Sequence, residues 1–325
     1  MTTLRRLRFL LNSASRIADA KALYAQLVVT RDCNLSCAYC NEYQTGAPPI
    51  PVTMLLERID RLDDLGVLVY DLLGGEPLLH PELPALVRHI KRKRGGANLA
   101  VLISNGFLLN EARIRALNEA GLDMLQISVD SVKPDGKSMK SLKSLMPKLR
   151  LLARDAHFPV KVQTVLSDET AAQYPEFRRL LEELPFDFSF SLLHHAGGRI
   201  AIGGRHLIEL LHRHRLWGGM RLYRKDAEAL LSGDFSRPWH CLGGFKFLYI
   251  NAEGLIQRCS QQPGRLIPLM QAGSVDLKAD SCHKSCEAGC AIGCARLVSH
   301  SLAHPLQSFR AGLDAVPDTA PSVVR

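Results

Sequence analysis

Residues 24–43 read YAQLVVTRDCNLSCAYCNEY and place three cysteines directly after an apolar run. The run 24–30 has the composition of a buried strand. Cys33, Cys37 and Cys40 then follow with the spacing C-x3-C-x2-C, in a chain of 325 residues that contains nine cysteines. Random placement gives this spacing with a probability of about 0.007, so composition does not explain it. Three thiolates at the end of one strand can hold three irons of a four-iron cluster and leave the fourth iron open for catalysis.

Strand and helix patterns alternate after this segment. Apolar residues three or four positions apart predict helices, and short apolar runs between them predict strands. Helices are expected near 54–65, 83–90, 110–120, 139–156 (interrupted at Pro147) and 171–183, with a less regular helical segment at 204–232. Further strands are expected at 67–73, 98–103, 124–130, 159–166 and 186–193. Six strands, each followed by a helix or loop, predict an α/β fold with parallel strands in a barrel-like or doubly wound sheet.

Polar motifs stand at the ends of four of the expected strands. In barrel enzymes the active site collects at the carboxyl ends of the strands, so catalytic motifs are expected there. Together with the cysteine run, and with Tyr39 just before its last cysteine, their order resembles the signature of radical S-adenosylmethionine (radical SAM) enzymes. The motifs are Gly74-Gly75-Glu76-Pro77, Ser104-Asn105-Gly106, Ser128-Val129-Asp130 and Gln163-Thr164-Val165-Leu166.

The resemblance implies a fold, two cofactors and a role for these residues. It implies a partial, six-stranded TIM-type barrel in which Cys33, Cys37 and Cys40 bind a [4Fe-4S] cluster whose open iron binds S-adenosyl-L-methionine. Reductive cleavage of that molecule gives a 5′-deoxyadenosyl radical, which abstracts hydrogen from a substrate C–H bond. The alternative is a zinc loop that takes one more ligand from elsewhere. By the same resemblance Tyr39 belongs to the cofactor site, and the GGEP turn receives the methionine ammonium. Ser104 and Asn105 form the [ST]NG turn. Ser128 and Asp130 hold the ribose and the methionine carboxylate, and Gln163 and Leu166 line the adenine.

Two histidines, His194 and His195, stand at the expected end of the sixth strand. A histidine in that place is commonly a hydrogen-bonded structural residue. Imidazole can also exchange protons near neutral pH, so a substrate or proton-transfer role is the catalytic hypothesis for this pair. Successive strand residues point to opposite faces, so only one of the two can face the barrel interior.

A second group of cysteines begins after residue 236. Cys241 is followed by twelve residues, Gly254, four residues and Cys259, which resembles the C-x(9–15)-G-x4-C opening of the auxiliary-cluster modules called SPASM or twitch. The runs 245–250 and 255–259 are expected to form a hairpin that brings both thiols back to one site.

Four more cysteines depart from the SPASM spacing, because Cys282, Cys286, Cys290 and Cys294 follow at intervals of four. The resemblance implies an auxiliary [4Fe-4S] cluster on Cys241 and Cys259 with ligands from Cys286, Cys290 and Cys294, which leaves Cys282 to spare. A second auxiliary cluster would leave some iron to the substrate, to His283 or to another ligand. A zinc site is the alternative.

Composition limits other function classes. The net charge is +9, but the basic runs lie on expected helices without interleaved aromatic residues, so we expect a solvated face and no nucleic-acid partner. Neither a secretory signal nor a membrane-spanning apolar run is apparent, which predicts a cytoplasmic protein. The expected domains are an N-terminal helical extension (1–23), a radical SAM barrel (24–235), an auxiliary-cluster module (236–300) and a disordered tail (301–325).

The sequence leaves the substrate open between classes. Peptide-modifying members of the resembled group commonly carry a winged-helix recognition domain near the N-terminus, and 32 residues precede Cys33. We therefore expect oxidation or another modification of a small molecule, with a peptide (RiPP) maturase as the alternative and a non-catalytic zinc-binding scaffold as a hypothesis from another class. The implied partners are the substrate and a reductant such as flavodoxin or ferredoxin.

Overall fold

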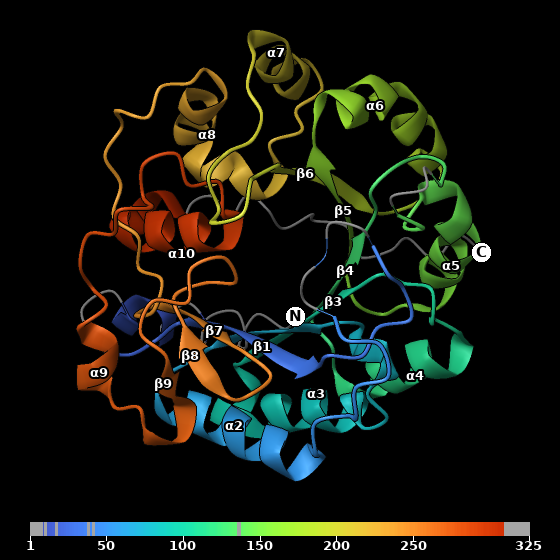
Figure 1. Cartoon of the computed structure of the whole chain (residues 1–325). Coiled ribbons are helices and arrows are strands. Elements are labelled where there is room, and N and C mark those ends of the chain that lie inside the picture. Colours follow the sequence, from blue (N-terminus) through green and yellow to red (C-terminus); the bar gives the residue numbers. More distant parts are fainter. Residues whose placement is uncertain are drawn as a thin grey trace.

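One sheet organises the molecule, and its strands follow the order β6-β5-β4-β3-β2-β1-β7-β8-β9. The computed structural model of the chain describes residues 9, 12–16, 19–37, 40, 43–134 and 138–308. Strands β1 to β6 run parallel to one another and curve into an open barrel (Figure 1). They are β1 (Tyr24–Thr30), β2 (Val69–Gly74), β3 (Leu99–Ser104), β4 (Met124–Ser128), β5 (Val160–Leu166) and β6 (Asp187–Leu192). The predicted partial barrel of six parallel strands is confirmed.

A ring of helices covers the outer face of the barrel (Figure 1). Each helix packs an apolar stripe against the sheet; in α3 the stripe is Leu83, Leu86, Val87 and Ile90, all buried. Burying one such side chain stabilises the fold by about 1.5–3 kcal/mol. The ring is formed by α2 (Val52–Asp64), α3 (Leu83–Arg92), α4 (Glu111–Ala120), α5 (Leu142–Asp155) and α6 (Asp168–Leu181), with short 3-10 turns η1 (Pro77–Leu79) and η2 (Lys93–Gly96).

Helix α5 differs from the prediction in two ways: it starts later, and Pro147 does not interrupt it. It begins at Leu142 and not at 139, because the hydroxyl of Ser141 accepts a hydrogen bond from the Ser144 N–H at 3.3 Å and caps the helix there. Pro147 lies inside the helix without interrupting it. The packing of Leu145, Leu149 and Leu152 against the core stabilises the helix enough to offset the hydrogen bond that proline cannot donate.

A second hydrophobic core closes the side of the barrel beyond β6. The irregular helical segment expected at 204–232 consists of α7 (Arg205–Arg213), η3 (Gly218–Tyr223) and α8 (Arg224–Leu231). Buried aromatic residues of this segment, Trp217 and Tyr223, pack with Phe190 of β6 and Leu166 of β5. The core therefore connects the sixth strand to the cysteine-rich end of the chain.

The cysteine-rich module shares the barrel sheet. Strand β7 (Phe247–Ile250) is buried along its whole length and pairs in parallel with β1, and β8 (Leu255–Gln257) returns antiparallel to it. The predicted hairpin is confirmed, but its parallel pairing with the first strand was not foreseen. The remaining elements are β9 (Ile267–Pro268), η4 (Leu269–Gln271), α9 (Ser274–Lys278) and α10 (Gly293–Ala303).

The two ends of the chain modify the expected boundaries. Residues 12–16 are helical, whereas Leu4, Leu7 and Leu11 of the expected N-terminal helix lie outside the described residues. The expected tail starts too early, because α10 includes residues 301–303, and residues 309–325 lie outside the described part. No helix among the described residues combines the length and the apolar character needed to cross a membrane.

Candidate functional site

The three cysteines of the first motif lie on the loop that leaves the carboxyl end of β1. The loop turns back on itself through a hydrogen bond from the Cys40 N–H to the Cys37 carbonyl at 3.0 Å. Cys37 is buried, and Cys33 and Cys40 are half-buried. Burial raises the pKa of the Cys33 thiol, and the negative charges of Glu76, Cys40 and Cys37 raise it further. The structure therefore brings the three predicted thiols together; Tyr39 lies outside the described residues.

The glycine pair after β2 supports this loop through a close backbone approach. A Cβ atom added to Gly75 would lie 2.2 Å from the Asp32 carbonyl oxygen, and one added to Gly74 would lie 2.1 Å from the Thr30 carbonyl oxygen. Gly74 also has a φ of 147°, which side chains rarely adopt. Only glycine fits at both positions, so the two backbones meet without side chains between them.

Glu76 joins the ends of two strands, β2 and β3. Its buried carboxylate accepts hydrogen bonds from the Ser104 hydroxyl at 2.8 Å, the Asn105 N–H at 2.8 Å and the Leu78 N–H at 3.0 Å. Burial raises the pKa of Glu76, while these hydrogen bonds oppose the rise. Since the carboxylate already has three donors, its role in the structure is to hold the β2 and β3 turns together; contact with the methionine ammonium stays a prediction.

Asn105 extends this network to the cysteine loop. Its amide Nδ2 donates to the Asn34 side chain at 2.9 Å and lies 4.0 Å from the Cys33 sulfur. Ser138, from the loop after β4, places its hydroxyl 3.4 Å from the Cys37 sulfur. The sequence motifs did not indicate Asn34 or Ser138, because neither belongs to a recognisable spacing.

The motif after β4 faces a lysine that the sequence did not single out. Asp130 is paired with Lys140 at 3.3 Å, and its N–H donates to the Lys140 carbonyl at 2.7 Å. Ser128 is half-buried at the end of β4. The pair sits on the same side of the barrel as Ser138, so the loop 138–141 gathers polar groups beside the cysteines.

The fifth strand places its two predicted residues differently. The Gln163 side-chain oxygen accepts a hydrogen bond from Ser189 of β6 at 2.6 Å. Leu166 is fully buried in the second hydrophobic core. Only its backbone is therefore left for a ligand, in line with the expectation that family members line the adenine with backbone here.

The two histidines after β6 form part of a tight turn. His194 Nδ1 lies 3.0 Å from the His195 carbonyl oxygen, and the His195 N–H donates to the Arg199 carbonyl at 2.8 Å. His195 is exposed. These contacts account for both residues as turn residues, and the catalytic role proposed for them stays a prediction.

The same turn attaches the barrel to the cysteine-rich module. The Ile200 N–H donates to the Gly289 carbonyl at 2.8 Å, and the Ala291 N–H donates to the Gly198 carbonyl at 2.8 Å. Cys290 lies between these two bonds. The second cysteine group is thereby fixed next to the end of β6.

Inside the barrel lies a charged group that the motifs did not reveal. Asp71 of β2 is buried and accepts a hydrogen bond from the Tyr24 hydroxyl. Burial raises the pKa of Asp71 to about 6, although hydrogen bonds from Tyr24 and Gln26 and the charge of Lys161 lower it. Burial also lowers the pKa of Lys161. The signal was present in the sequence, because an aspartate inside the apolar run VLVYDLL must point into an enclosed polar space.

Five of the six later cysteines converge on one place. Burial raises the pKa of Cys241, and the thiols of Cys259 and Cys286 add to the rise. Burial likewise raises the pKa of Cys290 to about 12, with contributions from Cys241 and Cys259. The fifth, Cys294, lies in the first turn of α10, and its sulfur is 3.9 Å from the Gln26 side-chain oxygen.

Residues 27–181 match the family model described as the Radical SAM superfamily. The chain belongs to this superfamily. The matched range contains the cysteine loop and the motifs that follow β2, β3, β4 and β5, so the resemblance drawn from these residues is confirmed and the chain is a radical SAM enzyme.

Two relatives cover different parts of the chain. The PqqA peptide cyclase of Gluconobacter oxydans is 28% identical over 264 residues, which are 73% of this chain and 69% of that protein. The GTP 3′,8-cyclase of Chlorobaculum tepidum is 38% identical over 111 residues, which are 34% of this chain and 33% of that protein. The chain thus matches about a third of the length of the GTP cyclase.

Two solved structures share the fold. SuiB of Streptococcus suis bound to S-adenosylmethionine has a TM-score of 0.59 at 13% identity, with 86% of this chain and 68% of that chain covered. anSMEcpe with bound AdoMet and a peptide has a TM-score of 0.55 at 16% identity, with 90% and 99% covered. At these identities the likeness establishes the fold alone.

In this radical SAM enzyme the described cysteines are not grouped as closely as the ligands of a preformed zinc site. A tetrahedral zinc site brings its sulfurs to about 3.8 Å of one another. In the described part of the chain, one group of His, Cys, Asp or Glu residues has its ligand atoms within 4.8 Å of one another. It consists of His240, His283 and Glu287. No three described cysteine sulfurs approach that closely.

Two buried cations complete the second cysteine site. Lys284 donates to the carbonyls of Cys241 at 2.6 Å and Cys282 at 3.1 Å. Arg296 donates from Nε to the Cys290 carbonyl at 2.6 Å. A four-iron cluster with four thiolates is an anion, so these cations fit a metal-loaded site. Cys282 itself is exposed, and its assignment as the spare thiol stays a prediction.

Proposed function

We propose that the loop of Cys33, Cys37 and Cys40 binds a [4Fe-4S] cluster and that the chain cleaves S-adenosylmethionine there. The cluster, when bound and reduced, supplies the electron that yields the hydrogen-abstracting 5′-deoxyadenosyl group. The observation that carries the proposal is the direct link between the loop and the strand-end motifs. Gly75 packs on Asp32, and Asn105 reaches Asn34 and Cys33.

The residues around this loop suggest how the second cofactor is held. The Gly74 and Gly75 carbonyl groups are candidate acceptors for an ammonium, at a turn whose nearest neighbours are backbone atoms of residues 30–32. Asp130 and Lys140 offer one acceptor and one cation for ribose hydroxyls and a carboxylate. This assignment keeps Ser128, Gln163 and the Leu166 backbone as lining groups.

For the substrate we favour a peptide, in which the chain makes or removes bonds at unactivated carbon. The support is the similarity to a PqqA peptide cyclase over 73% of this chain, a range that reaches beyond the cofactor half. The small molecule expected from the sequence rested on the short segment before Cys33. Where a chain begins carries no information on substrate, so that argument loses weight.

The auxiliary cysteines fit an oxidative outcome. A cluster on Cys241, Cys259, Cys286, Cys290 and Cys294 has more thiols than a four-iron cluster requires, so one is left over for a second role. Of these, Cys294 is the one that contacts the barrel interior through Gln26. An auxiliary cluster beside the barrel end is suited to accept an electron from a substrate radical, which makes the net reaction an oxidation.

The test uses anaerobically reconstituted protein with dithionite. We expect about eight irons and matching sulfide for two clusters, and formation of 5′-deoxyadenosine from S-adenosylmethionine. Cα- and side-chain-deuterated peptides encoded beside the gene should transfer deuterium into that product. Zinc without sulfide, or no 5′-deoxyadenosine, would refute the proposal.

A small-molecule substrate remains the second candidate. The observation in its favour is the higher identity, 38%, to a GTP 3′,8-cyclase. That match covers a third of the chain and informs chiefly on the cofactor half. Deuterium transfer from a labelled nucleotide or sugar, with none from peptides, would decide for this candidate.

A further inference from the structure

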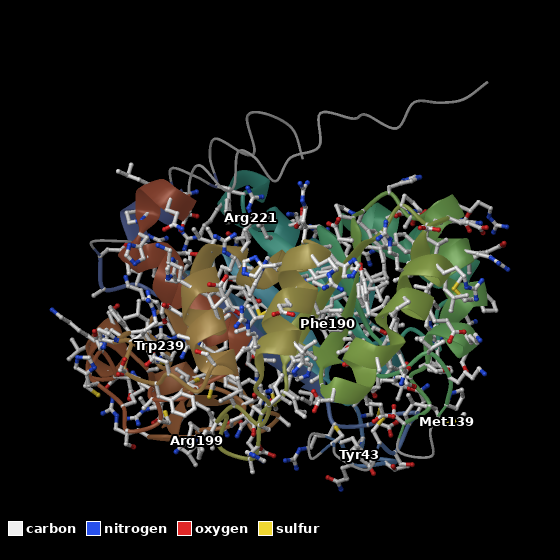
Figure 2. All side chains as sticks on the ribbon, turned by 90° about the horizontal axis from the view of Figure 1, so that it is seen from above. Tyr43, Met139, Phe190, Arg199, Arg221 and Trp239 are labelled. Carbon is white, nitrogen blue, oxygen red and sulfur yellow. The ribbon has the colours of Figure 1, made fainter. Side chains whose placement is uncertain are left out.

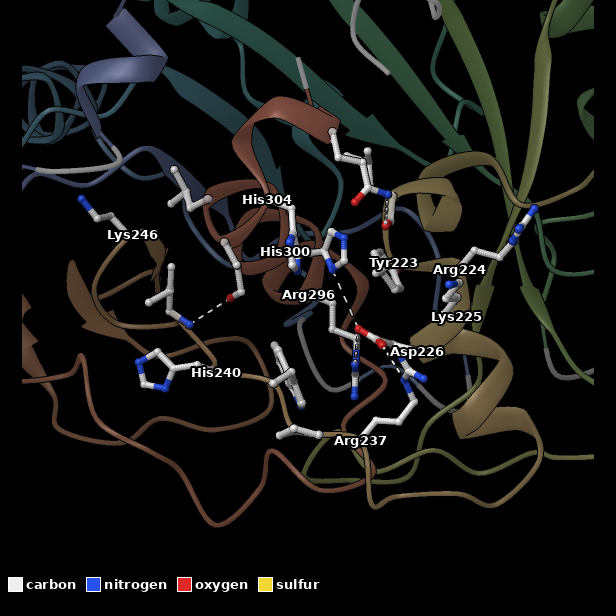
Figure 3. A pocket seen from close by; sticks show the side chains of 18 of the residues that line it. Tyr223, Arg224, Lys225, Asp226, Arg237, His240, Lys246, Arg296, His300 and His304 are labelled. Carbon is white, nitrogen blue, oxygen red and sulfur yellow. Dashed lines mark hydrogen bonds and ion pairs between the residues drawn. The ribbon is translucent and has the colours of Figure 1, made fainter. Parts of the chain in front are cut away.

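A basic cavity opens on the outer side of the cysteine-rich module (Figure 3). It has a volume of about 680 Å³ and lies between η3, α8, α10 and the segment 237–246. Six of the described residues that line it are lysine or arginine, and the carboxylate among them is Asp226. Asp226 is paired with Arg237 at 3.0 Å and lies 4.0 Å from Arg296, so it offsets only part of the positive charge.

The rim of this cavity includes basic residues of a run that the sequence predicted to form a solvated face. Arg221, Arg224, Lys225 and Arg237 are all exposed there. Arg224 is paired with the half-buried Glu228 at 3.4 Å, which offsets part of its charge. The folded chain therefore joins residues from two segments into one positive patch, which raises the rate at which an acidic partner associates.

The wall of the cavity is also the wall of the auxiliary cysteine site. The Arg296 guanidinium lies 4.2 Å from the Trp239 ring centre and donates to the Cys290 carbonyl at 2.6 Å. Trp239 Nε1 donates to the Glu287 carbonyl at 2.7 Å, and the Glu287 carboxylate accepts from the Cys241 N–H at 2.9 Å. One layer of side chains separates the patch from two candidate cluster ligands.

The Arg221 end of the patch lies away from the barrel mouth. Figure 2 has Arg221 near one end of the molecule and Tyr43, which follows the cysteine loop, at the other, beside Met139. A partner on the basic rim therefore leaves the mouth open to substrate. Electron transfer slows steeply with distance, so a redox partner on this rim exchanges electrons with the auxiliary site much faster than with the first cluster.

We propose that the rim of Arg221, Arg224, Lys225 and Arg237 docks an acidic electron-transfer protein of the flavodoxin class, which exchanges electrons with the auxiliary cluster. The proposal rests on the proposed iron–sulfur function. One electron leaves the auxiliary cluster, which has received it from the substrate radical, and enters the oxidised flavin of the partner; no bond of this chain is made or broken. Redox encounters of this kind use small interfaces and charge complementarity, which a four-residue rim can supply.

The first test is binding, without catalysis. The variant Arg224→Glu/Lys225→Glu reverses two rim charges in the first turn of α8, where acidic residues favour the helix dipole and folding is preserved. The control Arg178→Glu/Arg179→Glu makes the same change on α6, at side chains that are 59% and 67% exposed.

With an oxidised acidic bacterial flavodoxin at 50 mM salt, we expect about tenfold weaker binding for the rim variant and unchanged binding for the control. The difference should shrink at 500 mM salt, where charges are screened. Equal Kd values for the rim variant and the parent, or no binding by the parent, would overturn the proposal.

The second test separates the inference from the function on which it rests. With dithionite as reductant, the parent and the rim variant should form 5′-deoxyadenosine at the same rate. When dithionite-reduced, desalted protein is mixed with oxidised flavodoxin, the rim variant should need about tenfold more flavodoxin for a half-maximal rate of flavin reduction. Pyrophosphate could instead stabilise the parent but not the rim variant, while both proteins need the same flavodoxin concentration. In that case the cavity is a small-anion site and the docking proposal is wrong. No product with dithionite would refute the function instead.

Discussion

The two cysteine groups are built in opposite ways. Cys33, Cys37 and Cys40 lie on one loop after β1, and their spacing alone identified them. The later group comes from separate segments: Cys241 precedes β7, Cys259 follows β8, and Cys290 precedes α10. Only the folded chain brings Cys241 and Cys290 together. A local motif can be read from sequence, whereas a site assembled by long-range packing needs the structure.

Their surroundings differ as well. The first loop is half-buried and is held by neutral and acidic groups, Asn105, Ser138 and Glu76. The second group is more deeply enclosed and is backed by the cations Lys284 and Arg296. An open site with an incomplete ligand set suits catalysis, and an enclosed site with a full set suits storage of an electron. The comparison predicts that the two groups fail in different ways when one cysteine is removed.

The largest effect is expected for Cys37→Ala. Three thiols are the minimum ligand set of the first cluster, so loss of one should reduce 5′-deoxyadenosine formation to the background of dithionite alone. Iron content should fall by about half, because the later group is untouched. Product and iron are measured on anaerobically reconstituted protein. Formation of 5′-deoxyadenosine at the parent rate would show that the loop is not the cleavage site.

Cys259→Ala should give the complementary result. Iron should again fall by about half, but dithionite-driven cleavage of S-adenosylmethionine should continue, reduced by no more than about tenfold, because the first loop shares no ligand with the hairpin. Conversion of substrate should stop, since the acceptor of the second electron is gone. Iron and sulfide assays with product analysis test this; complete loss of cleavage would mean that the two groups form one functional unit.

The contrast also explains which features the sequence could foretell. The motifs stand at the carboxyl ends of β2 to β5, as predicted, because parallel strands place these ends on one rim of the barrel. The pairing of β7 with β1 escaped prediction, since it joins residues more than two hundred positions apart and leaves no local pattern. Helix α10 escaped it for a different reason. Gly293 weakens a helix interior, but it stands at the first position of this helix, where that cost is small.

Charged groups behind the cysteines were the hardest to foresee. Lys284 and Arg296 look like surface residues in the sequence, and only packing buries them against the carbonyls of cysteines. Asp71 was visible as a charge inside an apolar strand, but its partners Tyr24 and Gln26 come from another strand. Partner identity is a tertiary property, which spacing does not encode.

Asp71, buried on β2, predicts a pH effect. Its pKa is raised from 3.8 to about 6 in the folded chain, so its contribution to stability is fully present below pH 3.8 and is lost as the pH rises through 6. The whole loss is about 3 kcal/mol, and about half of it falls between pH 5 and pH 8. Relative to the parent, Asp71→Asn should therefore gain about 1.4 kcal/mol of unfolding free energy over that range.

Anaerobic urea unfolding of both proteins at pH 5, 6, 7 and 8 measures this gain. Any constant cost of the amide cancels, because it does not depend on pH. Tyr24→Phe is the matched variant: it removes a hydrogen bond that lowers the pKa of Asp71, so the loss should shift to higher pH. Parallel curves for the parent and Asp71→Asn would mean that Asp71 is not enclosed.

The smallest effect is expected for Cys282→Ser, and it sharpens the boundary of the second group. Cys282 is exposed, whereas Cys286, four residues later, is half-buried and adds to the charge around Cys241. Cys282→Ser should keep parental iron, sulfide and turnover and change the unfolding free energy by no more than about 0.5 kcal/mol. Cys286→Ser, the same chemical change, should lose iron. If instead Cys282→Ser loses iron and Cys286→Ser keeps it, the cluster ligand is Cys282, one cysteine earlier in the sequence than the burial of these residues indicates.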